Sequence, residues 1–106
     1  MHHNKFSETE PREIFPGFVG RFYHSAHSTF VHWEISPNAP LPEHSHVHEQ
    51  VVNVIEGQFE LTVEGKTTIL NSGDVVVIPS NARHTGHALT KCKVIDVFYP
   101  IREDYR

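Results

Sequence analysis

Apolar residues between positions 18 and 100 fall in short runs, most of them alternating with polar residues. The pattern is clearest in "QFELTVE", where Phe59, Leu61 and Val63 would face one side of an extended strand. Other runs rich in aromatic and β-branched residues are "FVGRFYH", "STFVHWEIS", "VVNVI", "TTIL", "VVVIP" and "KVIDVFYP". Such runs predict β-strands, and no stretch offers a capped segment of helical periodicity.

Turn residues separate these runs. Gly65 stands between "QFELTVE" and "TTIL" and predicts a hairpin, and "NSGD" predicts a turn before "VVVIP". The segment "SPNAPLPE" contains three prolines, which cannot donate to a strand ladder, so it is predicted as a long turn. Seven or eight strands at spacings of roughly 8 to 12 residues indicate an all-β sandwich or barrel.

The first part of the chain lacks this pattern. Residues 1–16 carry Pro11, Pro16 and many charged side chains without a clear period, and they are predicted as an N-terminal arm. Residues 17–106 are predicted as a single barrel domain, since 106 residues suit one domain with one modest core.

Composition excludes several classes of function. The formal net charge is −4 and no run of Lys or Arg occurs, which argues against a nucleic-acid partner. The longest apolar runs are too short to cross a bilayer, and the polar start lacks the apolar core of a secretion signal. Cys92 is the only cysteine, so no internal disulfide can form and a cytoplasmic location is expected.

Ten histidines are unusual for a chain of this length, and three of them occur in "HSHVHEQ". In an extended strand His44, His46, His48 and Gln50 would share a face that can bind a metal, whereas Glu49 would point away. A further ligand must come from another strand, and His84 is the best candidate because a turn, strand and turn precede it. The alternatives are a solvated strand face or hydrogen-bonded structural histidines.

These spacings resemble the two motifs of the cupin family, G-x5-H-x-H-x3,4-E-x6-G and G-x5-P-x-G-x2-H-x3-N. The first motif matches Asn38, His44, His46, Gln50 and Gly57, and the second matches Gly73, Pro79, Asn81 and His84, with Ala88 at the final Asn. The resemblance spans residues 18–100. It implies a double-stranded β-helix, a jelly-roll barrel that holds one divalent transition metal: Ni, Zn, Mn or Fe.

Two departures from the motifs have physical interpretations. Asn38 and Asn81 replace glycines, and Asn is the residue after glycine that best tolerates a left-handed backbone, so the turns should persist. Gln50 replaces a glutamate, which would leave the ion with only neutral ligands and favour Lewis-acid or positioning chemistry over redox chemistry. Loss of metal binding is the competing explanation. His48 is expected near the pocket rim, and His87 on the opposite side of its strand from His84.

The segment "VIDVFYPIRED" adds a buried acid. Asp96 and Phe98 share one face of the last predicted strand, which is otherwise apolar. Burial of an acid there is energetically costly unless the acid is paired or has a function in binding or catalysis. One interpretation is a structural ion pair between Asp96 and Arg102.

Together with "HSHVHEQ", the pattern Asp-x-Phe-x-Pro-x-Arg-Glu-Asp resembles the KdgF family of small cupins, which linearise the 4,5-unsaturated uronates released by pectin and alginate lyases. The resemblance implies His44, His46, Gln50 and His84 as metal ligands and Asp96, Phe98 and Arg102 as catalytic-site residues. Asp96 would transfer protons, Arg102 would bind the substrate carboxylate and Phe98 would form an apolar wall. A cupin dioxygenase and a non-catalytic sugar-binding protein remain alternatives, and a homodimer is expected.

Overall fold

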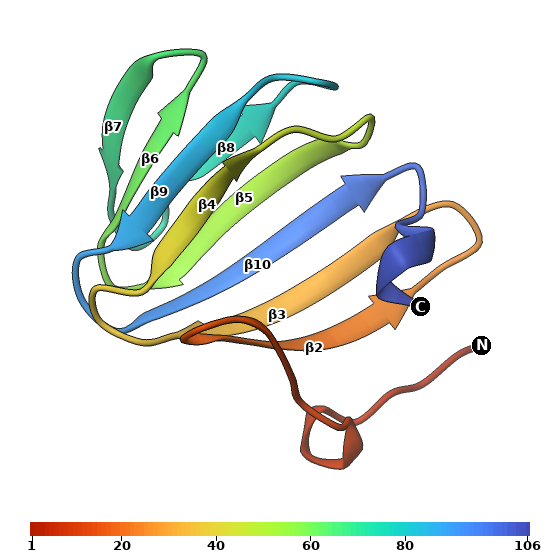
Figure 1. Ribbon diagram of the computed structural model, residues 1–106. Helices are drawn as coiled ribbons and strands as arrows, with labels where there is room; N and C mark the ends of the chain where they lie inside the picture. Colours follow the sequence, from red (N-terminus) through yellow and green to blue (C-terminus); the bar gives the residue numbers. More distant parts are fainter.

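The computed structural model describes residues 1–106 and contains two antiparallel sheets that enclose a common interior (Figure 1). The larger sheet has the order β1 (Arg12–Phe15), β2 (Phe18–His24), β3 (Thr29–Ile35), β10 (Cys92–Tyr99), β5 (Glu49–Glu56) and β8 (Val75–Ile78). The smaller sheet has the order β4 (Pro40–His44), β9 (His84–Ala88), β6 (Phe59–Val63) and β7 (Lys66–Leu70). The only helices are the 3₁₀ turns η1 (Phe6–Glu8) and η2 (Glu103–Tyr105), and neither could cross a membrane.

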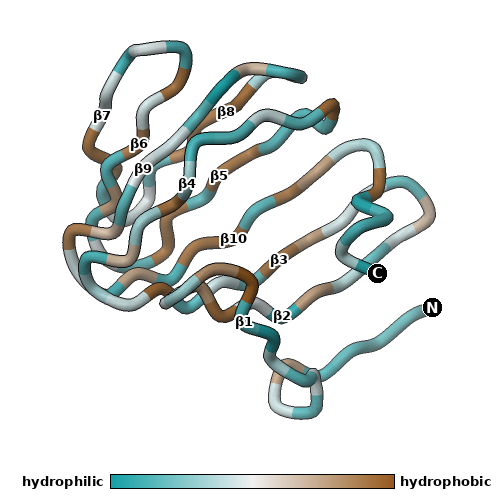
Figure 2. Tube along the Cα trace, in the orientation of Figure 1, coloured by the Kyte–Doolittle hydropathy of each residue, from teal (hydrophilic) through white to brown (hydrophobic).

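The seven apolar runs of the sequence form β2, β3, β5, β6, β7, β8 and β10, so the all-β prediction is confirmed. Alternation decides which side chains are buried: Phe59 and Leu61 of β6 face the core, as do Trp33 and Ile35 of β3. In all, 17 buried apolar residues form one cluster between the sheets. Figure 2 shows apolar positions recurring along the strands, while the N-terminal segment is hydrophilic.

Three further strands complete the sheets, and the sequence analysis did not expect the first two of them. The predicted long turn was wrong at Pro40–His44, which form β4; this strand is at a sheet edge and pairs only with β9, so the missing proline N–H groups break no second ladder. The sheet also begins inside the predicted arm, because Arg12–Phe15 pair with β2 as β1. Strand β9, "HTGHA", has no apolar run to reveal it.

Left-handed backbone occurs at the turn positions of both sequence motifs. Asn38 and Asn81 have φ values of 66° and 65°, as expected for asparagines that replace glycines. Gly57 and Gly73 have φ values of 92° and 94°. The predicted hairpin is confirmed, with Gly65 in the turn between β6 and β7.

Gly57→Ala is expected to lower the free energy of unfolding by about 2–4 kcal/mol. A Cβ atom there would lie 2.2 Å from the backbone oxygen of Lys91, in addition to the strain of the positive φ. Gly73→Ala is the matched control, because its φ is similar but a Cβ meets nothing within 4 Å. That variant should lose only about 1–2 kcal/mol. Urea denaturation of both variants measures the difference, and equal losses would contradict the role of the close contact.

Candidate metal centre and active site

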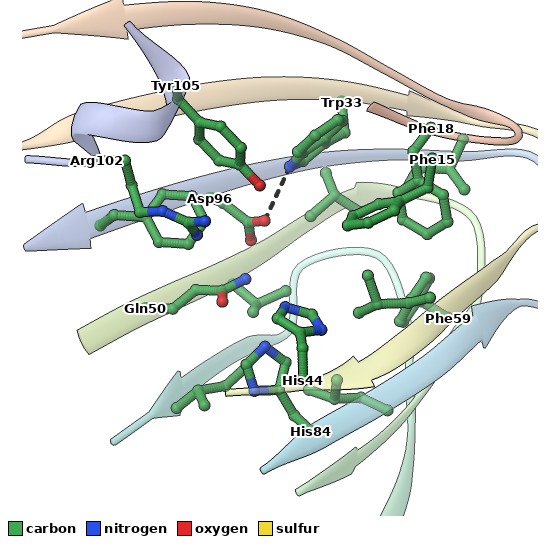
Figure 3. A pocket seen from close by; sticks show the side chains of 17 residues that line it. Phe15, Phe18, Trp33, His44, Gln50, Phe59, His84, Asp96, Arg102 and Tyr105 are labelled. Atoms are coloured by element: carbon green, nitrogen blue, oxygen red, sulfur yellow. Dashed lines mark hydrogen bonds between the residues drawn. The ribbon is translucent and has the colours of Figure 1, made fainter. Parts of the chain in front are cut away.

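A pocket opens between the two sheets, lined by 17 residues of which 12 are hydrophobic (Figure 3). The five polar lining residues are His44, Gln50, His84, Asp96 and Arg102. They come from β4, β5, β9, β10 and the segment after β10. A few convergent polar groups in an apolar cavity are typical of a small-molecule site.

The stretch "HSHVHEQ" contributes side chains to this pocket, but its backbone differs from the single strand that the sequence predicts. It is not one strand: His44 ends β4, residues 45–48 form a connection, and Glu49 begins β5 in the other sheet. Strand parity is therefore the wrong reason for the convergence of His44, His46 and Gln50. Their side chains meet because the chain crosses from one sheet to the other around the pocket. Glu49 is exposed and does not line the pocket.

Three imidazoles converge at this pocket, and two of them, His44 and His84, line it. Ring nitrogens of His44, His46 and His84 all lie within 4.8 Å of one another. His44 pairs directly with His84 in the register between β4 and β9. In each ring Nδ1 lies 2.7–2.9 Å from a backbone carbonyl oxygen, that of Pro42, His48 and Ala82 respectively. Because a carbonyl only accepts, Nδ1 carries the proton and Nε2 keeps its lone pair, the arrangement typical of metal-binding histidines.

The environment of His46 and His84 favours the neutral form that metal binding requires. Burial, followed by the charge of Arg102, lowers the pKa of His46 to about 4. Burial also lowers the pKa of His84. The Nε2 atom of His84 is buried and has no hydrogen-bond partner, which is costly unless another group binds it. The donor set therefore fits a divalent metal ion.

Gln50 lies beside these three histidines. Its Oε1 lies 3.1 Å from Nε2 of His46, and its amide nitrogen lies on the side of Asp96, as Figure 3 shows. The Gln50 amide on this side lowers the pKa of Asp96. Oε1 of Gln50 and Nε2 of His46 are then two facing acceptors, an arrangement that a cation between them would stabilise.

Asp96 is the buried acid of the pocket, with 7% of its surface exposed. Its Oδ2 accepts a hydrogen bond of 2.9 Å from Nε1 of Trp33, while its Oδ1 is buried without a partner. Burial raises the pKa of Asp96 to about 6, against the opposing effects of Gln50, Trp33 and Arg102. No ion pair joins Asp96 to Arg102, so the structural ion-pair interpretation is wrong.

Arg102 is paired with Asp104 instead. Its Nε and Nη2 donate to the two carboxylate oxygens at 3.0 and 2.7 Å. The guanidinium carbon also lies over two aromatic rings, 4.8 Å from the centroid of Phe98 and 4.1 Å from that of Tyr105, and these rings are tilted by 76° to each other. One edge of the guanidinium is thus occupied, while Nη1 forms no hydrogen bond and remains for a ligand of the pocket.

The remaining histidines have other surroundings. His48 is half-buried beside the tail, where burial and the charge of Arg102 lower its pKa. His87 faces away from the pocket and lies 3.8 Å from Glu60. His32 is on the outer face of β3, next to Phe6.

Two features of the pocket escaped the sequence analysis. Tyr105 lines it from η2, yet no motif distinguishes a tyrosine in a polar tail. Trp33 belongs to the buried core and also donates a hydrogen bond to Asp96. A signal existed for this second role, because a buried indole N–H requires an acceptor.

Comparison with known proteins places this geometry in a family. The cupin domain model matches residues 31–98. The pectin degradation protein KdgF of Dickeya dadantii (strain 3937) is 38% identical over 64 residues, which is 58% of this chain and 58% of that protein. The match therefore spans less than two thirds of the length of this relative.

Solved structures extend the likeness to the whole barrel. KdgF from Halomonas sp. has a TM-score of 0.90 at 30% identity, with 96% of each chain covered. An RmlC-like cupin from Shewanella frigidimarina NCIMB 400 has a TM-score of 0.94 at 29% identity, covering 100% of this chain and 96% of the other. A mutant salicylate 1,2-dioxygenase from Pseudoaminobacter salicylatoxidans shares the fold alone, with a TM-score of 0.79 at 20% identity over 85% of this chain and 28% of that one. The chain is thus a single jelly-roll barrel that belongs to the cupin family and resembles KdgF.

Proposed function

We propose that this protein is a metal-dependent enzyme that converts 4,5-unsaturated uronate monosaccharides from pectin or alginate into open-chain keto sugars. The observation that carries the proposal is a buried carboxylate oxygen without a partner, Oδ1 of Asp96, in a pocket that is also lined by a guanidinium and by two imidazoles of the three-histidine group. The likeness to KdgF proteins, one of them named for pectin degradation, supports this substrate class.

The reaction is an isomerisation that needs only proton transfer. The substrate is a cyclic enol ether with a carboxylate and a free anomeric hydroxyl. Removing the proton of the anomeric hydroxyl forms the C1 carbonyl as the bond from C1 to the ring oxygen breaks, and the electron pair of that bond stays on the former ring oxygen as an enolate. Protonation of C4 then gives the ketone, so no atom is gained or lost overall. Asp96 would accept the first proton, since a positioned carboxylate of pKa near 6 is a suitable general base.

Arg102 and Phe98 would hold the substrate. The free Nη1 side of the guanidinium would bind the uronate carboxylate, and the ring of Phe98 would form an apolar wall of the pocket. His44, His46, Gln50 and His84 would hold one divalent ion, with Ni, Zn, Mn and Fe all suited to an imidazole-rich site. When bound, such an ion supplies Lewis-acid stabilisation of negative charge on a substrate oxygen. Four neutral ligands favour this role over redox chemistry.

A direct assay tests the proposal. Metal-loaded protein should remove the ultraviolet absorbance of unsaturated galacturonate or unsaturated mannuronate far faster than the spontaneous reaction does. The preferred sugar distinguishes a pectin-derived from an alginate-derived substrate. Rates equal to the spontaneous rate with both sugars would refute the proposed activity, and binding without turnover would favour a non-catalytic sugar-binding role.

The second candidate is a metal-dependent dioxygenase. The shared fold with salicylate 1,2-dioxygenase and the three-histidine set favour it, whereas Asp96, Phe98 and Arg102 in the pocket favour the uronate reaction. An oxygen electrode in the same assay separates the two. Oxygen consumption in step with loss of the sugar would select the dioxygenase.

The pH dependence should report the ionisation of Asp96. Its pKa is raised to about 6 by burial, and a divalent cation beside Gln50 would lower this value. A base acts only when ionised, so kcat/KM of the loaded enzyme should rise with pH through a midpoint at or below about 6 and then level off. The measurement is kcat/KM across this range, with the metal content determined at each pH. A rate that instead rises as the pH falls would make Asp96 an acid.

We also propose a cytoplasmic homodimer. The outer face of β8, β5 and β10 is apolar and exposed at Val75, Val77 and Tyr99, and a second copy could cover it. The single free thiol, buried at Cys92, suits a reducing compartment. Sedimentation of a monomer at micromolar concentration would exclude the dimer.

A further inference from the structure

The tail after β10 contains two neighbouring acids with different partners. Asp104 binds Arg102 through both carboxylate oxygens, at 3.0 and 2.7 Å. Glu103 lies 3.6 Å from Arg106, and both of these side chains are largely exposed. The two acids thus have equal charge and adjacent positions, but only one of them contacts the pocket.

The contact with Asp104 fixes the orientation of Arg102. The Arg102 side chain is 10% exposed and that of Asp104 is 58% exposed, so the bonded edge of the guanidinium faces the rim of the pocket. The rings of Phe98 and Tyr105 pack against the guanidinium, and the two hydrogen bonds to Asp104 limit its rotation. Figure 3 shows the result, with Arg102 beside Tyr105 and reaching the space next to Asp96.

The segment that carries this pair is itself anchored. The backbone N–H of Tyr105 donates to the carbonyl of Arg102 at 3.1 Å. The carbonyl of Tyr105 accepts a hydrogen bond of 2.6 Å from Nη2 of Arg12. The backbone N–H of Arg102 donates to Oγ1 of Thr29, a fully buried side chain of β3. Asp104 is thus presented to Arg102 from a backbone tied to two strands.

The charges of the pair support each other. Burial lowers the pKa of Arg102, but the hydrogen bonds and charge of Asp104 outweigh it and raise the pKa overall. The same hydrogen bonds lower the pKa of Asp104, so both groups are ionised at neutral pH. A bidentate pair of this kind is geometrically specific, whereas the Coulomb energy of a half-exposed pair is strongly screened. The main effect of Asp104 should therefore be to orient the guanidinium of Arg102, and not to neutralise its charge.

We propose that Asp104 is a positioning residue that turns the free Nη1 side of Arg102 into the pocket and thereby makes the site selective for a carboxylate-bearing sugar. This inference rests on the proposed uronate function and adds a residue that acts only through Arg102. In the absence of Asp104 the guanidinium can rotate, and the substrate carboxylate meets a partner that must first be ordered.

The test compares Asp104→Ala with Glu103→Ala in the metal-loaded protein. Asp104→Ala should raise KM for the unsaturated uronate about 10-fold or more, with kcat changed less than threefold, because the carboxylate contact exists before and during the reaction. Glu103→Ala removes the same charge and should leave both constants unchanged. Asp104→Glu keeps the carboxylate and should recover most of the loss. An unchanged or lower KM for Asp104→Ala, or a loss shared equally by Glu103→Ala, would overturn the proposal.

A binding measurement keeps this test separate from that of the proposed function. Trp33 is the only tryptophan and binds Asp96 in the pocket, so its fluorescence should report occupancy by saturated galacturonate or by neutral galactose. Asp104→Ala should weaken galacturonate about 10-fold and leave the weaker galactose binding unchanged. If wild type binds galacturonate but turns over no unsaturated uronate, the proposed function fails while this comparison still decides the role of Asp104. Equal effects on both sugars, or no galacturonate binding by wild type, would refute it.

Discussion

Asp96→Asn is expected to lower kcat about 10²- to 10⁴-fold, the usual range for loss of a general acid–base group. Asparagine keeps the size of the side chain and an acceptor for Nε1 of Trp33, so the pocket should keep its shape. What it loses is the ability to take a proton through the unpartnered Oδ1. The rate at which the substrate absorbance is lost in the steady state measures the effect. KM should change little, because the substrate is held mainly by Arg102 and not by the carboxylate of Asp96.

Stability provides an internal check on this variant. The raised pKa of Asp96 means that the folded state disfavours its charge, so the amide should unfold at the same temperature as wild type or a higher one. Glu49→Gln is the matched control: the same change in charge, one residue from Gln50, on an exposed side chain. Equal rates for wild type and Asp96→Asn would exclude the proposed base. A rate lost only together with the folded structure would assign Asp96 a structural role.

The fold was largely predictable because burial in a two-sheet barrel leaves alternating apolar residues. That signal marks β6, where Phe59 and Leu61 are buried. It fails for β4, whose prolines look like a turn but lie on a sheet edge, and for β9, where Gly86 leaves no side chain to read. A Cβ at Gly86 would lie 2.3 Å from the backbone oxygen of Glu60. The neighbouring strand is therefore too close for an apolar side chain at this position.

The site was predictable in its members but not in its contacts. The motif spacing predicted that His44, His46, Gln50 and His84 lie close together, and they do. The spacing did not predict that residues 45–48 connect one sheet to the other. Spacing also drew attention to Arg102, yet it suggested the wrong ion-pair partner. The sequence suggests an ion pair between Asp96 and Arg102. In the structure Arg102 pairs with Asp104 instead, which lies only two residues further along the chain. Such choices depend on side-chain directions that a pattern of residue types does not contain.

His46→Ala is expected to abolish metal binding, reducing the bound ion from about one per chain to a small fraction measured by inductively coupled plasma mass spectrometry. Among the proposed ligands His46 is the most useful one to remove, since it is only half-buried and its loss leaves a smaller cavity than loss of the fully buried His84. Activity of the metal-treated variant should fall to that of metal-free wild type. His87→Ala is the control. This histidine lies on the outer face beside Glu60, so the variant protein should still bind the ion.

The thermal stability of the two forms tests the same point without an activity assay. An ion at 100 times its Kd should stabilise wild type by about 2.7 kcal/mol, and His46→Ala should lose this difference between loaded and metal-free protein. In the metal-free state the variant should be no less stable than wild type, because it removes the facing acceptors of His46 and Gln50. Full metal content in His46→Ala would show that these imidazoles are not the ligands. A metal-free wild type that is already as stable as the loaded form would mean that Gln50 and the histidines satisfy one another and that the site is structural.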